Sequence, residues 1–254
     1  MKKIFLTTSA LFIMGLATAQ AQQTQIIAHR GFWKTENSAQ NSITALQKAA
    51  QEQFFGSEFD IHITKDNVLV INHDADVNGI EIETNNYNKI AKVKLKNNEP
   101  LPTLENYLKA GKALPNIKLI LEIKPHKNVE RENQAVAETI QLVEKLNLAN
   151  QVEYISFSQN ICDQVKKQNP QAVVSYLNGD LSPQQVKSKG WDGIDYHFKI
   201  YQKNPTWITD AHNLGLITNT WTVNNPEVME EMIANKIQFI STDEPLVLKA
   251  KLQN

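Results

Sequence analysis

Seven polar side chains of this 254-residue chain combine metal-ligating, acid–base and anion-binding groups: His29, Arg30, Glu58, Asp60, His73, Glu122 and Lys124. Carboxylates are hard oxygen ligands that suit Mg²⁺ or Ca²⁺ better than Zn²⁺. Histidine exchanges protons near neutral pH, and arginine and lysine bind phosphate-like anions. A divalent ion, two acid–base histidines and two cations together suit the cleavage of a phosphodiester bond.

The spacing of these residues places two of the carboxylates on one face of a strand. In residues 58–63, the two-residue period of a strand puts Glu58 and Asp60 on one face and three apolar side chains on the other. Carboxylates that face the inside of a barrel would be costly unless they bind something. The segment therefore predicts a ligand-binding inner face and an apolar outer face that packs against helices.

Two further strands end in polar residues of the same kind. Residues 119–124 alternate so that Glu122 and Lys124 share a face near the C-terminal end, and the first strand ends in His29 and Arg30. Enzymes with a (β/α)₈ barrel carry their active sites at the C-terminal rim of the strands. We therefore expect these side chains to meet at one rim.

The rest of the chain alternates strand-like and helix-like segments, which favours a parallel sheet covered by helices. The strand-like runs are residues 26–30, 58–63, 117–124, 152–157, 172–176, 193–196, 216–223 and 238–241. Helix-like segments include residues 42–53, 129–146, 160–168, 183–188 and 226–234. Eight strands in a chain of this length predict a single α/β domain, a (β/α)₈ TIM barrel. The alternative is an open doubly wound sheet, but no Gly-x-Gly-x-x-Gly follows the first strand.

One segment interrupts this alternation. Residues 68–73 follow the second strand after a gap too short for a parallel crossover, so they predict a β-hairpin. Asp66 and Asn67 are plausible central turn residues. The register that follows from this turn places Asp60 directly opposite His73, on the same face of the hairpin.

The N-terminus is typical of a cleaved signal peptide. Lys2 and Lys3 precede an apolar stretch, and small residues follow it with possible cleavage after Ala19 or Ala21. We assign residues 1–21 to the signal peptide and residues 22–254 to one domain, an uncleaved membrane anchor being the alternative. The segment predicts an exported protein, periplasmic or secreted.

Composition excludes several other classes. A net charge of −1 offers no basic surface for a nucleic-acid partner. The single cysteine, Cys162, excludes an internal disulfide and a cysteine-based metal cluster. Beyond the N-terminal segment no apolar stretch is long enough to span a bilayer, so we expect no stable membrane insertion. The sequence leaves the oligomeric state open.

In their order along the chain, the polar motifs resemble those of the glycerophosphodiester phosphodiesterase family. They are His29-Arg30-Gly31, Glu58-Phe59-Asp60, His73-Asp74, Leu121-Glu122-Ile123-Lys124, Ile155-Ser156-Phe157-Ser158, Trp221-Thr222-Val223-Asn224 and Ser241-Thr242-Asp243-Glu244-Pro245. The resemblance covers nearly the whole mature chain. It implies a phosphodiesterase barrel with a small insertion after the second strand, here about residues 64–114 and containing the hairpin.

The resemblance also implies a role for each matching position. It implies catalysis by His29 and His73, one divalent cation (Ca²⁺ or Mg²⁺) on Glu58, Asp60 and Glu122, phosphate binding by Arg30 and Lys124, and contact with the glycerol by Trp221. The implied substrate is a small-molecule glycerophosphodiester. Its hydrolysis would give sn-glycerol 3-phosphate and an alcohol such as choline or ethanolamine.

The sequence departs from the family at one motif. Members usually carry Pro-Glu-Asn-Thr, and the spacing back from Glu58 selects Asn41 as its Asn. Gln40 then replaces the family Glu, and Ala39 replaces the Pro. Glu36 and Asn37 match the letters but not the spacing. Because the replaced Glu is not a metal ligand in the family, we expect the chemistry to survive.

Two other functions are compatible with the sequence. A phospholipase of the C or D type, acting on intact lipid, would need an apolar membrane-docking rim, for which Phe32 and Trp33 are the candidates. A non-catalytic barrel that binds phosphate esters is the second alternative. It is disfavoured because all seven polar positions of the motif set are filled.

Overall fold

The computed structural model describes residues 23–253, and the predicted signal peptide lies outside the described residues. Eight parallel strands close into a ring, in which each strand pairs with the next and the last pairs with the first. The ring consists of β1 (Gln25–Ala28), β2 (Gly56–Ile63), β6 (Lys118–Ile123), β7 (Val152–Ser156), β8 (Val174–Tyr176), β9 (Gly193–His197), β10 (Ile217–Trp221) and β11 (Phe239–Thr242). The predicted (β/α)₈ barrel is confirmed.

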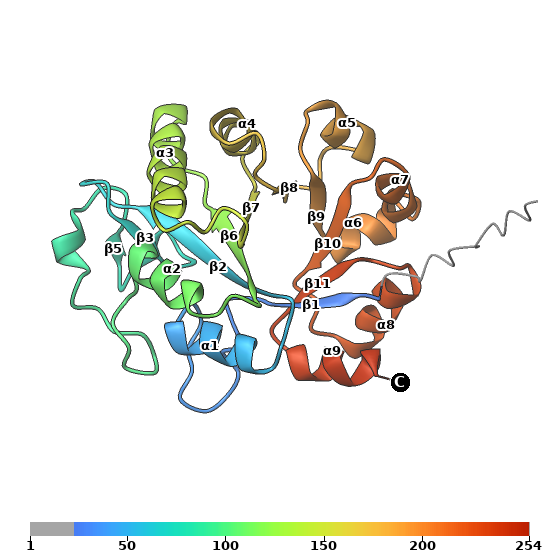
Figure 1. Cartoon of the computed structure of the whole chain (residues 1–254), viewed down its shortest axis with the longest axis horizontal. Coiled ribbons are helices and arrows are strands. Elements are labelled where there is room, and N and C mark those ends of the chain that lie inside the picture. The colour runs from blue at the N-terminus through green and yellow to red at the C-terminus, as the bar shows by residue number, and fades with distance from the viewer. Residues whose placement is uncertain (1–22, 254) are drawn as a thin grey trace, which may run out of the picture.

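Helices follow the ring strands and surround them (Figure 1). They are α1 (Ile43–Gln51), α2 (Leu104–Lys112), α3 (Val129–Lys145), α4 (Gln159–Gln168), α5 (Pro183–Ser188), α6 (Phe198–Lys203), α7 (Trp207–Asn213), α8 (Pro226–Ala234) and α9 (Pro245–Leu252). Local sequence fixes where several of them begin. Ser42, for example, precedes α1 and accepts a hydrogen bond from the backbone N–H of Ala45. No helix within residues 23–253 is long and apolar enough to cross a bilayer.

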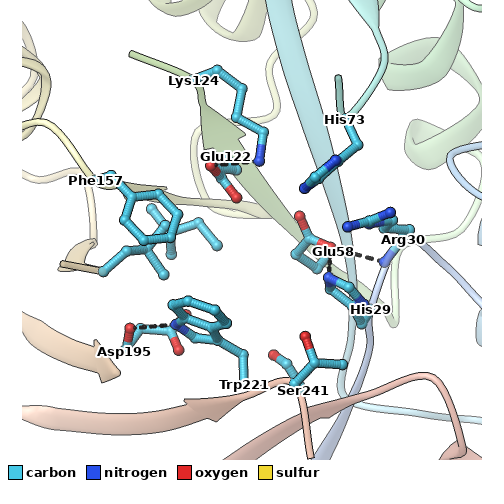
Figure 2. A pocket seen from close by; sticks show the side chains of 13 residues that line it. His29, Arg30, Glu58, His73, Glu122, Lys124, Phe157, Asp195, Trp221 and Ser241 are labelled. Carbon is cyan, nitrogen blue, oxygen red and sulfur yellow. Dashed lines mark hydrogen bonds and ion pairs between the residues drawn. The ribbon is translucent and has the colours of Figure 1, made fainter. Parts of the chain in front are cut away.

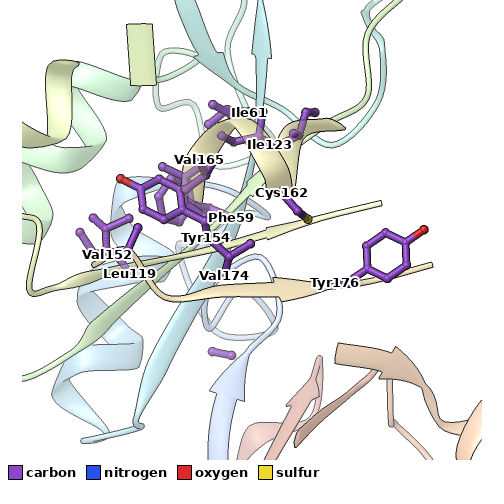
Figure 3. Packing of buried hydrophobic residues seen from close by; sticks show 14 of the residues in the cluster. Phe59, Ile61, Leu119, Ile123, Val152, Tyr154, Cys162, Val165, Val174 and Tyr176 are labelled. Atoms are coloured by element: carbon purple, nitrogen blue, oxygen red, sulfur yellow. The ribbon is translucent and has the colours of Figure 1, made fainter. Parts of the chain in front are cut away.

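The alternation of residue types along the strands creates two apolar layers. Outward-facing side chains such as Phe59, Leu119 and Tyr154 belong to the large core between strands and helices (Figure 3). Phe59 packs against Tyr107 of α2 with ring centroids 4.3 Å apart, so the outer face of β2 contacts a helix as predicted. A smaller cluster fills the barrel interior and contains Ile27, Ile120, Ile155, Leu177 and Phe239.

The segment after β2 forms the predicted hairpin. β3 (Leu69–Ile71) pairs antiparallel with the C-terminal end of β2 and lies outside the ring. A short β4–β5 pair (Asp76–Val77 and Ile80–Glu81) and a 3₁₀ turn (Tyr87–Lys89) follow, at one side of the barrel beside α2 (Figure 1). The segment has a small core of its own, formed by Val70, Val77, Ile82, Ile90 and Leu101.

The predicted register of the hairpin is wrong by one residue. The observed pairs place Ile61 opposite Ile71, and the backbone N–H of Asn72, not of His73, donates to the carbonyl of Asp60. The loop holds three residues rather than two, because Asn67 takes the left-handed conformation (φ +65°) after the turn. His73 therefore lies beyond the end of β3, and its position does not come from strand pairing.

Candidate active site

The C-terminal ends of the barrel strands meet around one pocket (Figure 2). The predicted site residues that line it are His29, Arg30, Glu58, His73, Glu122, Lys124 and Trp221. The remaining predicted residue, Asp60, is buried beside them and pairs with Lys124. The structure thus brings all eight predicted site residues together, although they come from segments almost two hundred residues apart.

Glu58, Asp60 and Glu122 form a compact cluster of buried carboxylates. One oxygen from each lies within 4.8 Å of the others. Glu58 Oε1 has no hydrogen-bond partner among residues 23–253. Oxygen ligands crowded in this way, with one unsatisfied, fit a hard divalent cation such as Mg²⁺ or Ca²⁺.

Burial and mutual repulsion act strongly on this cluster. Burial raises the pKa of Glu58 well above its usual range, and the neighbouring charges of Asp60 and Glu122 add to the effect. Burial likewise raises the pKa of Glu122 to about 7. Burial alone would also raise the pKa of Asp60, but Lys124 and Asn41 outweigh it and bring that pKa to about 2. A bound cation would relieve the repulsion among the three carboxylates.

Two basic side chains border the cluster. Lys124 Nζ lies 2.7 Å from Asp60 Oδ1 and 2.8 Å from Glu122 Oε1, and these ion pairs raise the pKa of Lys124 although burial opposes them. The Arg30 guanidinium donates to Gln40 Oε1 at 3.0 Å, and its Nε lies 3.9 Å from Asp60 Oδ2. Arg30 Nε is buried and has no hydrogen-bond partner in the described chain. Arg30 therefore retains donor capacity for an anion in the pocket.

The His29-Arg30-Gly31 motif forms a tight turn at the end of β1. Arg30 (φ +57°) and Gly31 (φ +79°) both take the left-handed conformation, which directs the Arg30 backbone N–H onto Glu58 Oε2 at 2.8 Å. A Cβ on Gly31 would lie 2.6 Å from the Cβ of Ala45 in α1. Glycine is required there both by the backbone conformation and by the close approach of the helix.

His29 is oriented by Asp243, which follows β11. The two side chains are 2.8 Å apart at His29 Nδ1 and Asp243 Oδ1. Burial opposes ionisation of Asp243, but the hydrogen bond and charge of His29 outweigh it and bring the Asp243 pKa to about 2. Because the carboxylate only accepts, Nδ1 of His29 carries the proton, and Nε2 faces Glu58 Oε2 at 4.0 Å.

His73 is held in a similar way by its neighbour in the sequence. Its Nδ1 lies 2.7 Å from Asp74 Oδ1. The Nε2–H of His62 donates to the backbone carbonyl of His73 at 3.2 Å, which fixes the chain after it leaves β3. Burial, and then the charge of Lys124, lower the pKa of His73. Both histidines are thus bound to an aspartate through Nδ1.

The opposite side of the pocket is apolar. Ile155, Phe157, Leu177 and Trp221 line it, and the Phe157 and Trp221 rings meet edge to face with centroids 5.4 Å apart (Figure 2). The indole N–H of Trp221 donates to the backbone carbonyl of Asp195 at 2.8 Å. Trp221 therefore presents its ring to the pocket, as expected for a side chain that contacts the carbon skeleton of a ligand.

The altered motif around Gln40 lies at the site. Asn41 Nδ2 donates to Asp60 Oδ2 at 2.8 Å, while Gln40 contacts Arg30. These contacts agree with the assignment made by spacing rather than with Glu36-Asn37. The family motif has Glu at the position of Gln40. In this chain Arg30 therefore donates to a neutral amide there rather than to a carboxylate.

Sequence reasoning assigned no role to Asp243 or Asp195, although both belong to the site. Asp243 was part of a recognised motif, but its partner is more than two hundred residues away, so no local pattern could pair them. Asp195 did carry a signal. It is a charged residue in a strand whose neighbours Ile194 and Tyr196 are apolar and buried, the pattern that identified Glu58 and Asp60.

Fold and pocket together define a class of protein. A (β/α)₈ barrel that gathers a carboxylate cluster able to hold a cation, two histidines and two basic side chains at its C-terminal rim has the groups that a hydrolase of phosphate esters needs.

Comparison with known proteins identifies the family. The model of the glycerophosphoryl diester phosphodiesterase family matches residues 29–247, and the chain belongs to this family. A glycerophosphodiester phosphodiesterase of Caldanaerobacter subterraneus is 26% identical, over 89% of this chain and 96% of that protein.

Solved structures agree with this assignment. A crystal structure of a glycerophosphodiester phosphodiesterase from Parabacteroides distasonis has a TM-score of 0.90 and 46% identity, and the match covers 91% of this chain and 98% of that one. A phosphodiesterase of Oleispira antarctica, solved in complex with the product sn-glycerol-3-phosphate, shares the fold with a TM-score of 0.79. It is 17% identical, with 91% of this chain and 98% of that chain covered.

Proposed function

We propose that this enzyme hydrolyses small-molecule glycerophosphodiesters to sn-glycerol 3-phosphate and an alcohol, with one divalent cation, Ca²⁺ or Mg²⁺. The observation that carries the proposal is the pairing, in one pocket, of the Glu58, Asp60 and Glu122 cluster with two aspartate-bound histidines. Family membership supports the same reaction class. The product-bound phosphodiesterase of Oleispira antarctica shows that this fold accommodates the expected product.

The residues divide the chemistry between them. Arg30 and Lys124 hold the phosphate, and a cation on the three carboxylates would neutralise its developing charge. One of the histidines, His29 or His73, removes the proton from the attacking oxygen, which belongs to water or to the glycerol 2-hydroxyl by way of a cyclic phosphate. The other protonates the leaving alcohol.

The structure disfavours the alternative of a phospholipase that docks on a lipid surface. Phe32 is only 7% exposed and packs against Phe54, and the indole N–H of Trp33 donates to Asp243. Neither side chain is free to insert into a bilayer, and a docking rim would need exposed apolar groups around the pocket. A soluble diester is therefore the favoured substrate class.

The test is release of sn-glycerol 3-phosphate by the processed protein. Glycerophosphocholine and glycerophosphoethanolamine would each be assayed with Ca²⁺, Mg²⁺ and EDTA. His29→Ala is the test variant, and His212→Ala is the control, because His212 lies on α7 and bonds Thr218 outside the pocket. We expect metal-dependent release that is lost in His29→Ala and kept in His212→Ala. Release that is unchanged by EDTA, or no release from either diester, would overturn the proposal.

We also propose that the protein is exported, to the periplasm or beyond, after cleavage behind Ala19 or Ala21. Both sites leave a mature chain that begins with Gln, at position 20 or 22. Mass spectrometry of the N-terminal peptide from each cell fraction checks this proposal. A full-length chain retained in the cytoplasm would contradict it.

A further inference from the structure

Asp195 is a carboxyl group that the proposed reaction does not use. It lies on β9, is 1% exposed, and points into the apolar side of the pocket near Trp221 (Figure 2). Its neighbours in the strand, Ile194 and Tyr196, face the outer core. A carboxyl group among Ile155 and Leu177 needs a reason to be there, because burial of a polar group is unfavourable unless it forms hydrogen bonds.

Only one of the two carboxyl oxygens of Asp195 has a hydrogen-bond partner among the described residues. Its Oδ2 accepts a hydrogen bond from Asn219 Nδ2 at 2.9 Å, and the same amide also donates to Ser241 Oγ at 3.2 Å. This chain of contacts fixes the orientation of the carboxyl group. The other oxygen, Oδ1, is buried and has no hydrogen-bond partner among residues 23–253. An oriented, unpartnered polar atom in the wall of a pocket is positioned to bind a ligand group.

The protonation state of the Asp195 carboxyl group favours an uncharged group of the ligand as its partner. Burial raises its pKa to about 8, Glu122 adds to the rise, and the Asn219 hydrogen bond opposes it. At neutral pH the group is then an uncharged acid that can both donate and accept. Such a group suits a hydroxyl, whereas a carboxylate here would repel the phosphodiester anion.

The shape of the site indicates which hydroxyl this is. Asp195, Leu177 and Ser241 are all buried and line the pocket but not the groove that adjoins it, and we refer to their side of the pocket as its closed end. On the opposite side, Arg30 and His73 also border a wide groove between the β1–α1 loop and the insertion. Leaving alcohols differ in size and fit the open groove, whereas the glycerol moiety is common to all these diesters and fits the closed end.

We propose that Asp195 binds the terminal hydroxyl of the glycerol moiety at the closed end of the pocket, and that the leaving alcohol occupies the groove beside His73. The proposal rests on the proposed function and adds to it a determinant of substrate recognition. It makes Asp195 a substrate-binding residue whose contribution depends on one substrate hydroxyl.

The experiment is a cycle of two enzymes and two substrates. The wild type and Asp195→Leu are assayed on glycerophosphocholine and on 2-hydroxypropyl phosphocholine, which keeps the hydroxyl next to the phosphate-bearing carbon but lacks the terminal one. We expect the wild type to prefer glycerophosphocholine by about tenfold in kcat/KM, the size of one hydrogen bond. Asp195→Leu should lose this preference, falling about tenfold on the full substrate and little on the analogue.

Controls separate binding from folding. Tyr154→Phe also removes an unpartnered buried polar atom, but Tyr154 belongs to the outer core, so the substrate preference should not change. Asp195→Asn keeps a polar group of the same shape and should keep the preference, which tests the idea even if Asp195→Leu does not fold. Equal losses on both substrates, or an unchanged preference in Asp195→Leu, would overturn the proposal. Because the wild-type assay on glycerophosphocholine is part of the cycle, failure of the proposed function itself would be seen separately.

Discussion

The two histidines of the pocket are held by the same type of contact in two different settings. His29 and Asp243 come from opposite ends of the chain and are mostly buried, with side chains 17% and 16% exposed. His73 and Asp74 are adjacent in the insertion, with side chains 40% and 75% exposed. One pair is built into the barrel, and the other lies on a segment added to it.

The difference extends to the partners of each aspartate. Asp243 also accepts from Trp33 Nε1 at 3.1 Å and from Asn224 Nδ2 at 2.8 Å, so its position is fixed by the β1–α1 loop and the loop after β10 as well. Asp74 binds His73 from a solvent-exposed position, where hydrogen bonds and charges compete with water. We infer that Asp243 holds His29 rigidly in the barrel. The position of His73 in the insertion instead relies on the contact of His62 with its backbone.

The largest effect on kcat is expected when either histidine is removed, and it shows whether the mostly buried His29 and the more exposed His73 are both needed. His29→Ala and His73→Ala should each lower kcat by about 10²–10⁴, because each removes an acid–base group. The measurement is kcat on glycerophosphocholine at saturating metal, with melting temperature as a check on folding. A His73→Ala variant with near-normal kcat would exclude His73 from the mechanism. His29 would then be the only catalytic histidine of the pocket.

The second prediction compares the two aspartates directly. Asp243→Asn should lower kcat by about a hundredfold, because an amide can donate to Nδ1 and favour the wrong tautomer of His29. Asp74→Asn should lower it by less than about tenfold, since its contact is exposed and His62 still holds the backbone of His73. Both variants are compared at one pH and metal concentration. Equal losses of kcat in the two variants would show that the burial of Asp243 does not make it more important than Asp74.

The third prediction concerns acid stability. The pKa of Asp243 is lowered from its ordinary value of 3.8 to about 2, so its ionised form stabilises the fold. This contribution is complete above pH 4 and is lost as the pH falls from about 4 to about 2. Asp243→Asn should therefore cost about 2 kcal/mol at pH 7, and the difference from the wild type should shrink toward pH 2.

Chemical denaturation of both proteins between pH 7 and pH 2 measures this difference. Asp74→Asn serves as the exposed comparison and should change the free energy of unfolding little at any pH in this range. A pH-independent deficit in Asp243→Asn would mean that packing, rather than the charge of Asp243, accounts for its contribution.

The same contrast explains what the sequence could predict. Alternation of residue types along β2 and β6 identified the inward carboxylates, and the succession of strand-like and helix-like segments identified the ring of eight strands, because both are patterns of neighbouring residues. His73 was placed in the site through the wrong register, since the left-handed conformation of Asn67 adds a residue to the turn. The helices α2, α6, α7 and α9 were not identified, although α5, with only six residues, was, so helix length alone does not explain which helices were missed.

The partners of the site residues were harder to predict than the residues themselves. The Asp243–His29 contact depends on closure of the ring between β1 and β11, which no local pattern encodes. Asp195 differs, because a carboxylate at an inward position of a buried strand is visible in the sequence once the barrel is assumed. Long-range contacts therefore account for most of what was missed, and unused local signals account for the rest.

The smallest expected effect on kcat concerns the hydrogen bonds that hold the His29–Asp243 pair. Trp33→Phe removes one of the hydrogen bonds to Asp243 Oδ1 but keeps an aromatic ring. Because His29 and Asn224 still bind Asp243, kcat should fall by less than about threefold, the effect of one hydrogen bond among several. Combining Trp33→Phe with Asp243→Asn should add nothing further, since the tryptophan acts on His29 only through Asp243. A double variant much slower than Asp243→Asn alone would show that Trp33 contacts the substrate directly.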